Sequence, residues 1–487
     1  LLYMRICFNS DYYLRNDGKR VILSTTTHAI EHEGKRPWMS RIHPLYAMIL
    51  AILSMPKEIE EAIDDISDFF GFSNTQASEM IASLIKKEYY KEASFDGTVN
   101  YFPGDVLLTD NEIKKPSSYS PTEFIFKEVD VDSQRMILAP NSVLLIINNK
   151  CATQCAYCYA DKKHVCSTTL SFKKIKSIID DACALGIREF EIIGGEFFLF
   201  PQWEELLDYL LSKGILPRMI STKVPLSDNQ IERFSRFNIR LQISLDSVFP
   251  KILSDTLKVS DSYAEKIKAT IRNVDASGIR YQLATVLTYS SASIKNLEGL
   301  YEFIKTLDNL KGWEIRYAFK SLYASVPYEN LKVPDGFHKI VSEWYKRIKD
   351  NIKCRVDIPS SEKDELYYAE GGSRSFKGAR CSANISNMVI LPDGNVTICE
   401  QLYWNPHYII GNINSNSIKE IWNSSRAIEL ISKQQKSISR KSECSRCKLY
   451  DDCFTYANRC HPNILKHYGD DCHDFPDPRC VKASPIH

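Results

Sequence analysis

Residues 151–158 read CATQCAYC, a loop that carries Cys151, Cys155 and Cys158 at CxxxCxxC spacing. The loop directly follows the apolar run VLLII at residues 143–147, a pattern that predicts a buried strand. Three thiolates can hold three irons of a cubane cluster, which leaves the fourth iron open to bind a small molecule. A closed zinc site needs four protein ligands, so zinc is the weaker metal hypothesis. A disulfide with one spare thiol is the remaining alternative.

With an aromatic residue just before its last cysteine, this loop resembles the signature of the radical S-adenosylmethionine (SAM) family. The resemblance implies that Cys151, Cys155 and Cys158 hold a catalytic 4Fe–4S cluster, and that the amine and carboxylate of SAM chelate its open iron. Reduction of the cluster would cleave SAM and release a 5′-deoxyadenosyl radical, which abstracts a hydrogen from the substrate. The resemblance also implies that Tyr157 contacts the adenine ring.

The composition indicates a soluble globular protein of two to four domains. The 487 residues are 44% hydrophobic and their net charge is +1, so there is no electrostatic reason to expect a nucleic acid partner. The longest apolar run, at residues 48–53, is far too short to span a membrane. Fifteen cysteines without an opening signal segment predict a cytoplasmic location, where thiols bind metal rather than form disulfides.

Strand-like and helix-like patterns alternate from residue 143 onward. Strands are predicted at 143–148, 189–193, 217–221, 239–245, 281–287 and 313–319, with amphipathic helices such as 172–185 and 261–277 between them. Six such units predict a parallel α/β core over residues 140–330. The family resemblance makes this core a partial (β/α)6 TIM-like barrel. In such barrels the chemistry lies at the C-terminal ends of the strands, where the cysteine loop falls.

Gly194, Gly195 and Glu196 end the second predicted strand. Glycines allow a ligand to approach the backbone closely, and a neighbouring carboxylate can accept a hydrogen bond from an ammonium group. The run resembles the GGE motif of the family, which holds the amine of SAM. Phe197 stands where the family usually has proline.

Polar residues end the later predicted strands, and the resemblance gives them a role in cofactor binding. A polar residue at a strand end is also a common local cap, so this alternative stays open. Lys223 stands where asparagine is usual, and Lys258 stands where many relatives have arginine. Because lysine lacks the bidentate fork of arginine, no carboxylate-binding role is assigned to Lys258. The cofactor-binding residues predicted in this way are Ser221, Ser244, Asp246 and Thr288.

Residues 1–105 predict a separate winged-helix domain. A helix is predicted from 43 to about 55, a second opens at Pro56, and a third follows Gly71 with Ser73 as its cap. A hairpin over 89–102 follows, with its turn at Asp96-Gly97. Winged helices commonly bind DNA, but residues 43–92 hold four lysines, no arginine and nine acids, a net charge of −5. Such a surface repels phosphates, so DNA binding is not expected.

A winged helix ahead of a radical SAM core is similar to the leader-recognition element of enzymes that modify ribosomally made peptides. There the leader segment of a precursor peptide adds as a strand to a sheet edge. A plain packing or dimerisation domain is the alternative. Residues 106–139 contain a Pro- and Ser-rich stretch and predict a surface linker.

The C-terminal residues 379–487 carry a second cysteine pattern, after a bridge at 331–378. Cys381, Gly394 and Cys399 fit Cx12Gx4C and enclose a predicted hairpin over 388–398. With the later cysteines, this pattern resembles the SPASM extension of radical SAM enzymes, which binds two auxiliary 4Fe–4S clusters. A zinc ribbon is the competing hypothesis. The later cysteines are Cys444, Cys447, Cys453, Cys460, Cys472 and Cys480.

The resemblance also implies how these cysteines divide. The distal cluster takes Cys444, Cys447, Cys453 and Cys480, and the proximal cluster takes Cys381, Cys399 and Cys460. Because Cys453 and Cys460 are spaced Cx6C rather than the usual CxxxC, Cys472 competes for the third proximal position. The fourth proximal ligand is left open between Cys472, Cys354 and no protein residue.

Taken together, these patterns predict a radical SAM peptide maturase with three 4Fe–4S clusters and an external electron donor of flavodoxin or ferredoxin type. The expected product is an intrapeptide crosslink, most simply a thioether. The alternatives are carbon–carbon or carbon–oxygen crosslinking, epimerisation, formylglycine-type protein maturation and, outside enzymes, an iron–sulfur redox sensor.

Overall fold

A computed structural model describes residues 4–85, 88–359, 381–455, 459–480 and 482–483. The chain divides into two compact units. Unit 1 comprises residues 1–141 and 182–188, and unit 2 comprises 142–181 and 189–487.

Unit 1 contains the three predicted helices followed by the predicted hairpin. The helices are α2 (Pro44–Ile52), α3 (Ile59–Phe70) and α4 (Asn74–Ile85), and the hairpin pairs β6 (Tyr90–Phe95) with β7 (Thr98–Pro103). The prediction that Pro56 opens a helix is wrong. The short strand β5 (Lys57–Glu58) lies between this proline and α3, because its backbone pairs with β1 (Arg5–Phe8).

Two antiparallel sheets complete unit 1. Strands β2 (Tyr12–Asn16), β3 (Val21–Thr25) and β4 (Met39–Ile42) form one sheet, and helix α1 (Thr27–Glu33) connects the last two. Strand β1 lies between β5 and β8 (Leu107–Thr109) in the other sheet. Strand-like stretches of the sequence near residues 5–8 and 20–24 correspond to β1 and β3, whereas the other strands of these sheets are short and lack a sustained period.

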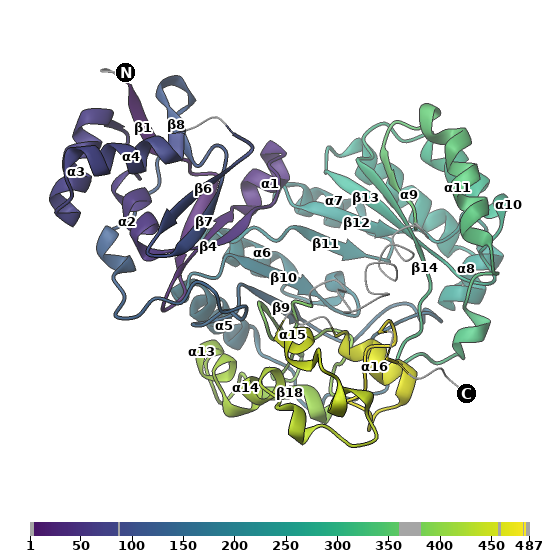
Figure 1. Ribbon diagram of the computed structural model, residues 1–487. Coiled ribbons are helices and arrows are strands. Elements are labelled where there is room, and N and C mark those ends of the chain that lie inside the picture. The colour runs from purple at the N-terminus through teal and green to yellow at the C-terminus, as the bar shows by residue number, and fades with distance from the viewer. Residues whose placement is uncertain (1–3, 86–87, 360–380, 456–458, 481, 484–487) are drawn as a thin grey trace. The chain divides into compact units, whose positions relative to one another are not determined.

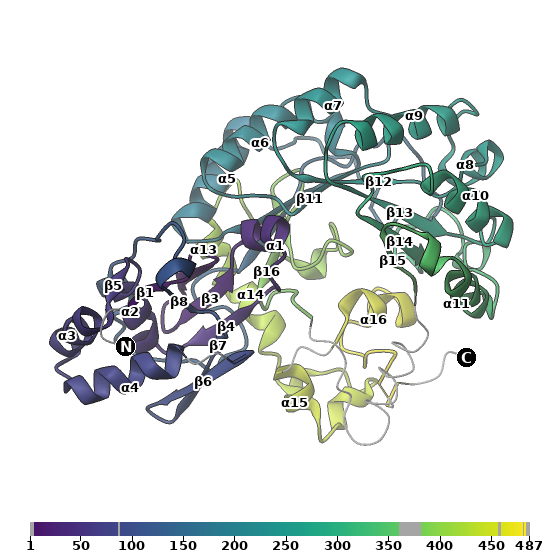
Figure 2. The same ribbon diagram turned by 90° about the horizontal axis from the view of Figure 1, so that it is seen from above.

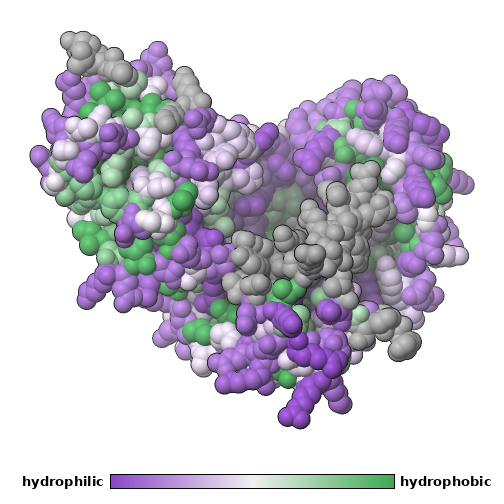
Figure 3. Space-filling model, viewed as in Figure 1, coloured by the Kyte–Doolittle hydropathy of each residue, from purple (hydrophilic) through white to green (hydrophobic). Residues whose placement is uncertain are grey.

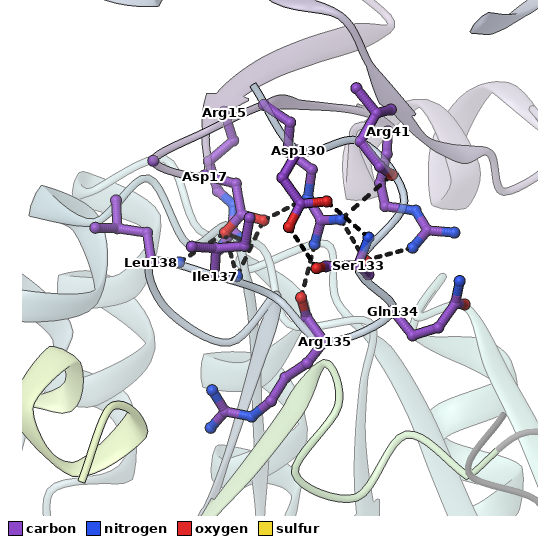
Figure 4. Close-up of polar contacts among 12 residues, drawn as sticks. Arg15, Asp17, Arg41, Asp130, Ser133, Gln134, Arg135, Ile137 and Leu138 are labelled. Carbon is purple, nitrogen blue, oxygen red and sulfur yellow. Dashed lines mark hydrogen bonds and ion pairs between the residues drawn. The ribbon is translucent and has the colours of Figure 1, made fainter. Parts of the chain in front are cut away.

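The segment 106–139, predicted as a surface linker, is part of unit 1 and packs into it. Phe124 is 1% exposed and belongs to the same hydrophobic core as the helices. Asp17 and Arg20, both fully buried, form an ion pair of 2.9 Å. Asp17 also accepts hydrogen bonds from the backbone N–H groups of Ile137 (3.0 Å) and Leu138 (2.9 Å), as Figure 4 shows. This segment is therefore held by buried charges that its own polar sequence does not reveal.

Unit 2 confirms the α/β barrel core with its six predicted strands. These are β9 (Ser142–Ile146), β10 (Glu189–Ile193), β11 (Met219–Thr222), β12 (Arg240–Ser244), β13 (Tyr281–Leu287) and β14 (Gly312–Tyr317). Strands β11 to β14 pair in parallel and β15 (Arg355–Asp357) extends them.

Helices cover the outer side of the barrel strands, as the two ribbon views show (Figures 1 and 2). They alternate with the strands along the chain, as the periodicity predicts. Helix α11 (Phe337–Ile348) follows β14. The other helices are α5 (Phe172–Ala184), α6 (Trp203–Ser212), α7 (Asp228–Ser235), α8 (Pro250–Leu257), α9 (Tyr263–Ala276) and α10 (Ile294–Ile304).

The predicted C-terminal hairpin extends the barrel sheet. Its first strand β16 (Asn387–Ile390) pairs in parallel with β9, the strand that precedes the cysteine loop, and in antiparallel with β17 (Asn395–Thr397). Strand β18 (Ile409–Asn412) continues the sheet beyond β17. Leu144 and Ile146 of β9 pack with Val389 in a small core of their own. The cysteine-rich segment is thus fixed to the strand that carries the cluster loop.

Short helices follow this hairpin. They are α13 (Ile418–Trp422), α14 (Ser425–Ile431), α15 (Tyr450–Thr455) and α16 (His461–Tyr468). On the face shown in Figure 3 this region is largely hydrophilic. Among the described residues, every helix falls short of the length and apolarity that crossing a membrane requires.

Candidate active site

The three cysteines of the loop after β9 line a cavity of about 240 Å³. The hydroxyl oxygen of Thr153 lies 3.3 Å from the sulfurs of both Cys151 and Cys155. The backbone N–H groups of Gln154 and Ala156 donate to carbonyl groups at the end of α8, each at 2.9 Å. These hydrogen bonds fix the backbone of an irregular loop, and its three thiols line one cavity.

The glycines at the end of β10 bring a second backbone segment against this loop. The N–H of Gly195 donates to the carbonyl of Asn148 at 2.8 Å. A Cβ on Gly195 would lie 2.1 Å from the carbonyl oxygen of Lys150. Only glycine therefore fits here, because the backbone of the cysteine loop lies against it; the approach of a ligand to this glycine stays a prediction.

Glu196 is 3% exposed and lies on the wall of the same cavity. Its carboxylate accepts hydrogen bonds from the hydroxyl of Thr222 (2.9 Å) and the backbone N–H of Lys223 (3.0 Å). Burial raises the pKa of this carboxyl group, and the hydrogen bonds act in the opposite direction. A buried carboxylate at this wall can accept from the amine of an amino acid.

Asp246 follows β12 and is 1% exposed. It accepts from the Nζ of Lys223 at 3.1 Å, from the hydroxyl of Tyr157, and from the backbone N–H of Val286 at 2.9 Å. Burial lowers the pKa of the Lys223 ammonium group, whereas Asp246 and the nearby Cys155 raise it. Together these charges have the larger effect, so the pKa lies above its usual value. Asp246 therefore organises the cavity wall.

The structure brings most of the predicted cofactor residues to the cavity. Tyr157, Gly194, Gly195, Glu196, Ser221 and Ser244 line it, and Asp246, which is absent from the lining, accepts a hydrogen bond from Tyr157. Thr288 is an exception. It is 1% exposed, its N–H donates to the hydroxyl of Ser291 at 2.8 Å, and the cavity lining contains Val286 instead. Thr288 thus caps its own strand end, the alternative left open for such residues.

Several lining residues were not among the predicted site residues. Lys223 was noted at its strand end without a role, and Arg316 lies near the end of β14, so the rule that chemistry lies at C-terminal strand ends could have found both. Phe319 lies just beyond β14 and stacks on Tyr159, with ring centroids 6.1 Å apart. Tyr403 comes from the C-terminal segment, and no local pattern places it in the cavity.

The C-terminal thiols fall into two groups. Burial, together with the neighbouring Cys381 and Cys460, raises the pKa of Cys399 to about 12. The pKa of Cys453 is also raised to about 12, by burial and by three neighbouring cysteines. The three are Cys444, Cys447 and Cys480. Cys399 thus neighbours two thiols of the predicted proximal set, and Cys453 neighbours three of the predicted distal set; the ligand sets themselves stay a prediction.

Cys354 lies apart from both groups. It precedes Arg355, which pairs with Gly312 at the N-terminal end of β14, whereas the cavity lies at the opposite ends of the strands. It neighbours Tyr281, the first residue of β13, and burial raises the pKa of its thiol to about 11. This position argues against Cys354 as the fourth proximal ligand.

Buried polar groups beside the proximal thiols fit a bound cluster. Tyr408 is 1% exposed and neighbours Cys460 and Cys399. Its hydroxyl and the Nδ1 of His461 are buried, and neither has a hydrogen-bond partner among the described residues. An acceptor such as a cluster sulfide would satisfy both atoms. Within the described ranges, no three His, Cys, Asp or Glu side chains gather closely enough to hold a single metal ion.

Two domain families match the chain in the expected order. Residues 145–304 match the radical SAM superfamily, and residues 381–448 match the SPASM iron–sulfur cluster-binding domain. Of curated proteins, the subtilosin biosynthesis protein AlbA of Bacillus subtilis is 23% identical over 63% of this chain and 65% of its own length. The sporulation killing factor maturation protein SkfB of the same species is 24% identical over 63% of this chain and 68% of its own.

Solved structures of one protein match nearly the whole chain. Streptococcus suis SuiB bound to its precursor peptide SuiA covers 98% of this chain and 100% of SuiB, with a TM-score of 0.63 and 16% identity. At this identity the likeness establishes a shared fold.

Proposed function

Because the chain is a radical SAM enzyme that carries a SPASM iron–sulfur domain, we propose that it modifies a ribosomally made precursor peptide. A hydrogen is removed from a core residue of that peptide, and an intrapeptide crosslink forms. A thioether is the preferred proposal for this crosslink. When bound, SAM and the reduced cluster supply the radical that removes the hydrogen. The chain itself positions the peptide and excludes water.

One observation carries this proposal, namely the shared wall of the cavity. Tyr403 lies four residues after Cys399 and lines the same cavity as Cys158 of the cluster loop. The hydroxyl of Tyr323 donates to the carbonyl of Leu402 at 2.6 Å and so fixes this wall. A substrate in the cavity would therefore lie near the proximal thiols, where an auxiliary cluster can accept an electron or bind a substrate thiolate.

The similar proteins support a peptide as the substrate. AlbA and SkfB are named for the biosynthesis and maturation of a bacteriocin and a killing factor, and SuiB was solved with a precursor peptide. The likeness to SuiB also extends through unit 1. A protein maturase or redox sensor gives no reason for this N-terminal similarity.

Unit 1 offers a groove for the leader of the peptide. The groove has a volume of about 540 Å³ and is lined by charged and aromatic side chains, including Lys35, Arg36, Trp38 and Tyr89. Strand β8 also borders it and, within the described part of the chain, pairs with β1 alone, so its other edge can accept an added strand. We therefore expect the leader to dock here through backbone hydrogen bonds.

The proximal thiols support an auxiliary cluster. Cys381, Cys399 and Cys460 are its proposed ligands, with Cys472 as the alternative to Cys460. Because Cys354 lies elsewhere, the fourth position falls to Cys472 or to no protein residue, and the second case would leave an open iron. With the loop cluster and the distal cluster, the enzyme would hold three 4Fe–4S clusters. A flavodoxin- or ferredoxin-type protein would supply the electrons.

Mass spectrometry of an anaerobic reaction tests the proposal. The reaction contains the reconstituted enzyme, reductant, SAM and the short peptide encoded beside the gene. Loss of two hydrogens per modification supports crosslinking, and alkylation of the remaining thiols distinguishes a thioether from a carbon linkage. Cys158→Ala is the matched control, because it removes a ligand of the loop cluster only.

Other outcomes identify the alternatives. Unchanged mass in ordinary water, with deuterium incorporated from heavy water, indicates epimerisation. SAM cleavage without any peptide change refutes this peptide as the substrate. Absence of SAM cleavage in the fully reconstituted enzyme contradicts the enzyme assignment itself and favours the redox sensor.

A further inference from the structure

Lys223 is the least exposed cation of the active-site cavity. Three cationic side chains line this cavity, namely Lys162, Lys223 and Arg316. Arg316 is exposed and donates two hydrogen bonds of 2.6 Å to Glu314, outside the cavity lining. Lys162 donates to the carbonyl of Thr153 at 3.0 Å. The side chain of Lys223, by contrast, is only 14% exposed.

Two neighbours hold the ammonium group of Lys223 in place. It lies 3.1 Å from the carboxylate of Asp246 and donates to the hydroxyl of Tyr157. It also lies 5.1 Å from the centre of the Tyr157 ring. Because Tyr157 stands between Cys155 and Cys158, these contacts hold the ammonium group beside the cluster loop.

The backbone of Lys223 contacts the other charged group of the cavity. Its N–H donates to the Glu196 carboxylate at 3.0 Å. Lys223 therefore brings its ammonium group and the buried carboxylate of Glu196 to the same wall of the cavity. An α-amino acid bears its amine and its carboxylate on a single carbon, so it presents the complementary pair of charges.

The position where relatives have arginine does not reach this cavity. Lys258 ends α8 in the left-handed conformation, with φ at 57°, and is exposed. It is absent from the cavity lining, all of which lies in described residues. The cation that meets a carboxylate in this cavity must come from another element.

We propose that Lys223 binds the carboxylate of the methionine part of SAM, beside Glu196, which receives the amine. Lysine provides one strong point charge rather than the two-pronged fork of arginine, and Asp246 with Tyr157 fixes its direction. The proposal rests on SAM as the cofactor, and it explains why this strand end carries lysine.

Binding of two ligands to the reconstituted enzyme tests the role. The ligands are SAM and decarboxylated SAM, which keeps the amine and lacks the carboxylate, and Kd is measured by anaerobic equilibrium dialysis. Lys223→Met is expected to weaken SAM binding about 10- to 100-fold, the range of a charged hydrogen bond. The same variant should bind decarboxylated SAM as the wild type does. Lys258→Met is the matched control and should change neither Kd.

Removal of Lys223 leaves Asp246 buried without its cation, which can impair folding. The double variant Lys223→Met/Asp246→Asn removes both charges and provides the second measurement. Its preference for SAM over decarboxylated SAM should fall by the same factor as in the single variant. Lys223→Arg keeps the charge and should retain most of the preference.

The ratio of the two Kd values decides the outcome. Equal weakening of both ligands in both variants would mean that Lys223 shapes the cavity without meeting the carboxylate, which overturns the proposal. Unchanged binding of SAM also overturns it. If the wild type with a full loop cluster fails to bind SAM, the assignment of the cofactor is wrong, and this failure is distinct from a failure of Lys223.

Discussion

A single methyl group at Gly195 should disrupt the loop that holds the first cluster. The added Cβ would lie 2.1 Å from the carbonyl oxygen of Lys150, 2.5 Å from its carbon and 2.9 Å from the carbonyl carbon of Asn149. All three are backbone atoms, so no side chain can turn away. To regain ordinary contact distances the two segments must separate by about 1 Å. Cys151 is the next residue in the loop and must move with it.

Gly194 provides the matched comparison on the same strand end. A Cβ there would lie 3.1 Å from the carbonyl oxygen of Asn148 and 3.2 Å from a side-chain carbon of Ile147. A shift of a few tenths of an ångström relieves this contact. Because a misplacement of about 1 Å costs roughly 100-fold in rate, Gly195→Ala should cleave SAM about 100 times more slowly than the wild type. Gly194→Ala should lose about 10-fold or less.

The assay measures iron and sulfide content, the absorbance of the loop cluster and the rate of 5′-deoxyadenosine formation. Cysteine-to-alanine variants of the auxiliary ligands isolate the signal of the loop cluster. Equal cluster content and equal SAM cleavage in Gly195→Ala and Gly194→Ala would refute the argument from backbone contact.

Three further predictions concern unit 1, where hydrogen exchange of its peptides in the intact protein reports stability. Asp17→Asn should cost about 3–5 kcal/mol, because it leaves the buried Arg20 unpaired, and a loss below about 1 kcal/mol would contradict this. The Nδ1 of His43 accepts from the N–H of Leu45 at 3.1 Å, and burial lowers the pKa of the imidazole. This cap contributes about 1 kcal/mol of stability, which is present above the pKa that His43 has in the unfolded chain. The contribution is lost as pH falls through the lower pKa that His43 has in the folded protein. His43→Asn should keep the cap, and its contribution should not depend on pH. Burial lowers the pKa of Lys91, which is 2% exposed, to about 8, so unit 1 should gain about 3 kcal/mol as pH rises from 8 toward 10.5. Lys91→Met should abolish this rise, and a rise that persists would assign it to another group.

The sequence by itself determined the features that depend on short stretches of chain. CxxxCxxC spacing fixes three thiols on one loop through covalent geometry alone. Short apolar or alternating stretches, separated by helices with a period of 3.6 residues, located all six barrel strands, because local patterns of this kind mark buried strands and helix faces. The need for glycine at the end of the second strand was also predicted, although the expected partner was a ligand, whereas the structure places the backbone of residues 149–150 against Gly195.

Only the tertiary structure decided the features that join distant stretches. The pairing of Asn387 in β16 with Ser142 in β9 connects residues that are far apart along the chain, and no local period encodes it. The same holds for Tyr403 in the cavity wall. Residues 106–139 were predicted as a linker because the buried charges that hold them, such as Asp17, lie in another part of the sequence.

Polar residues at strand ends show most clearly what the sequence determines and what only the tertiary structure decides. From the sequence, Thr288 and Lys223 are both polar residues at the end of a barrel strand. Thr288 turns into a local cap with Ser291, while Lys223 is drawn into the cavity by Asp246 and Tyr157. The difference depends on which partners the neighbouring strands bring within hydrogen-bond distance. Only packing of the whole barrel sets those distances.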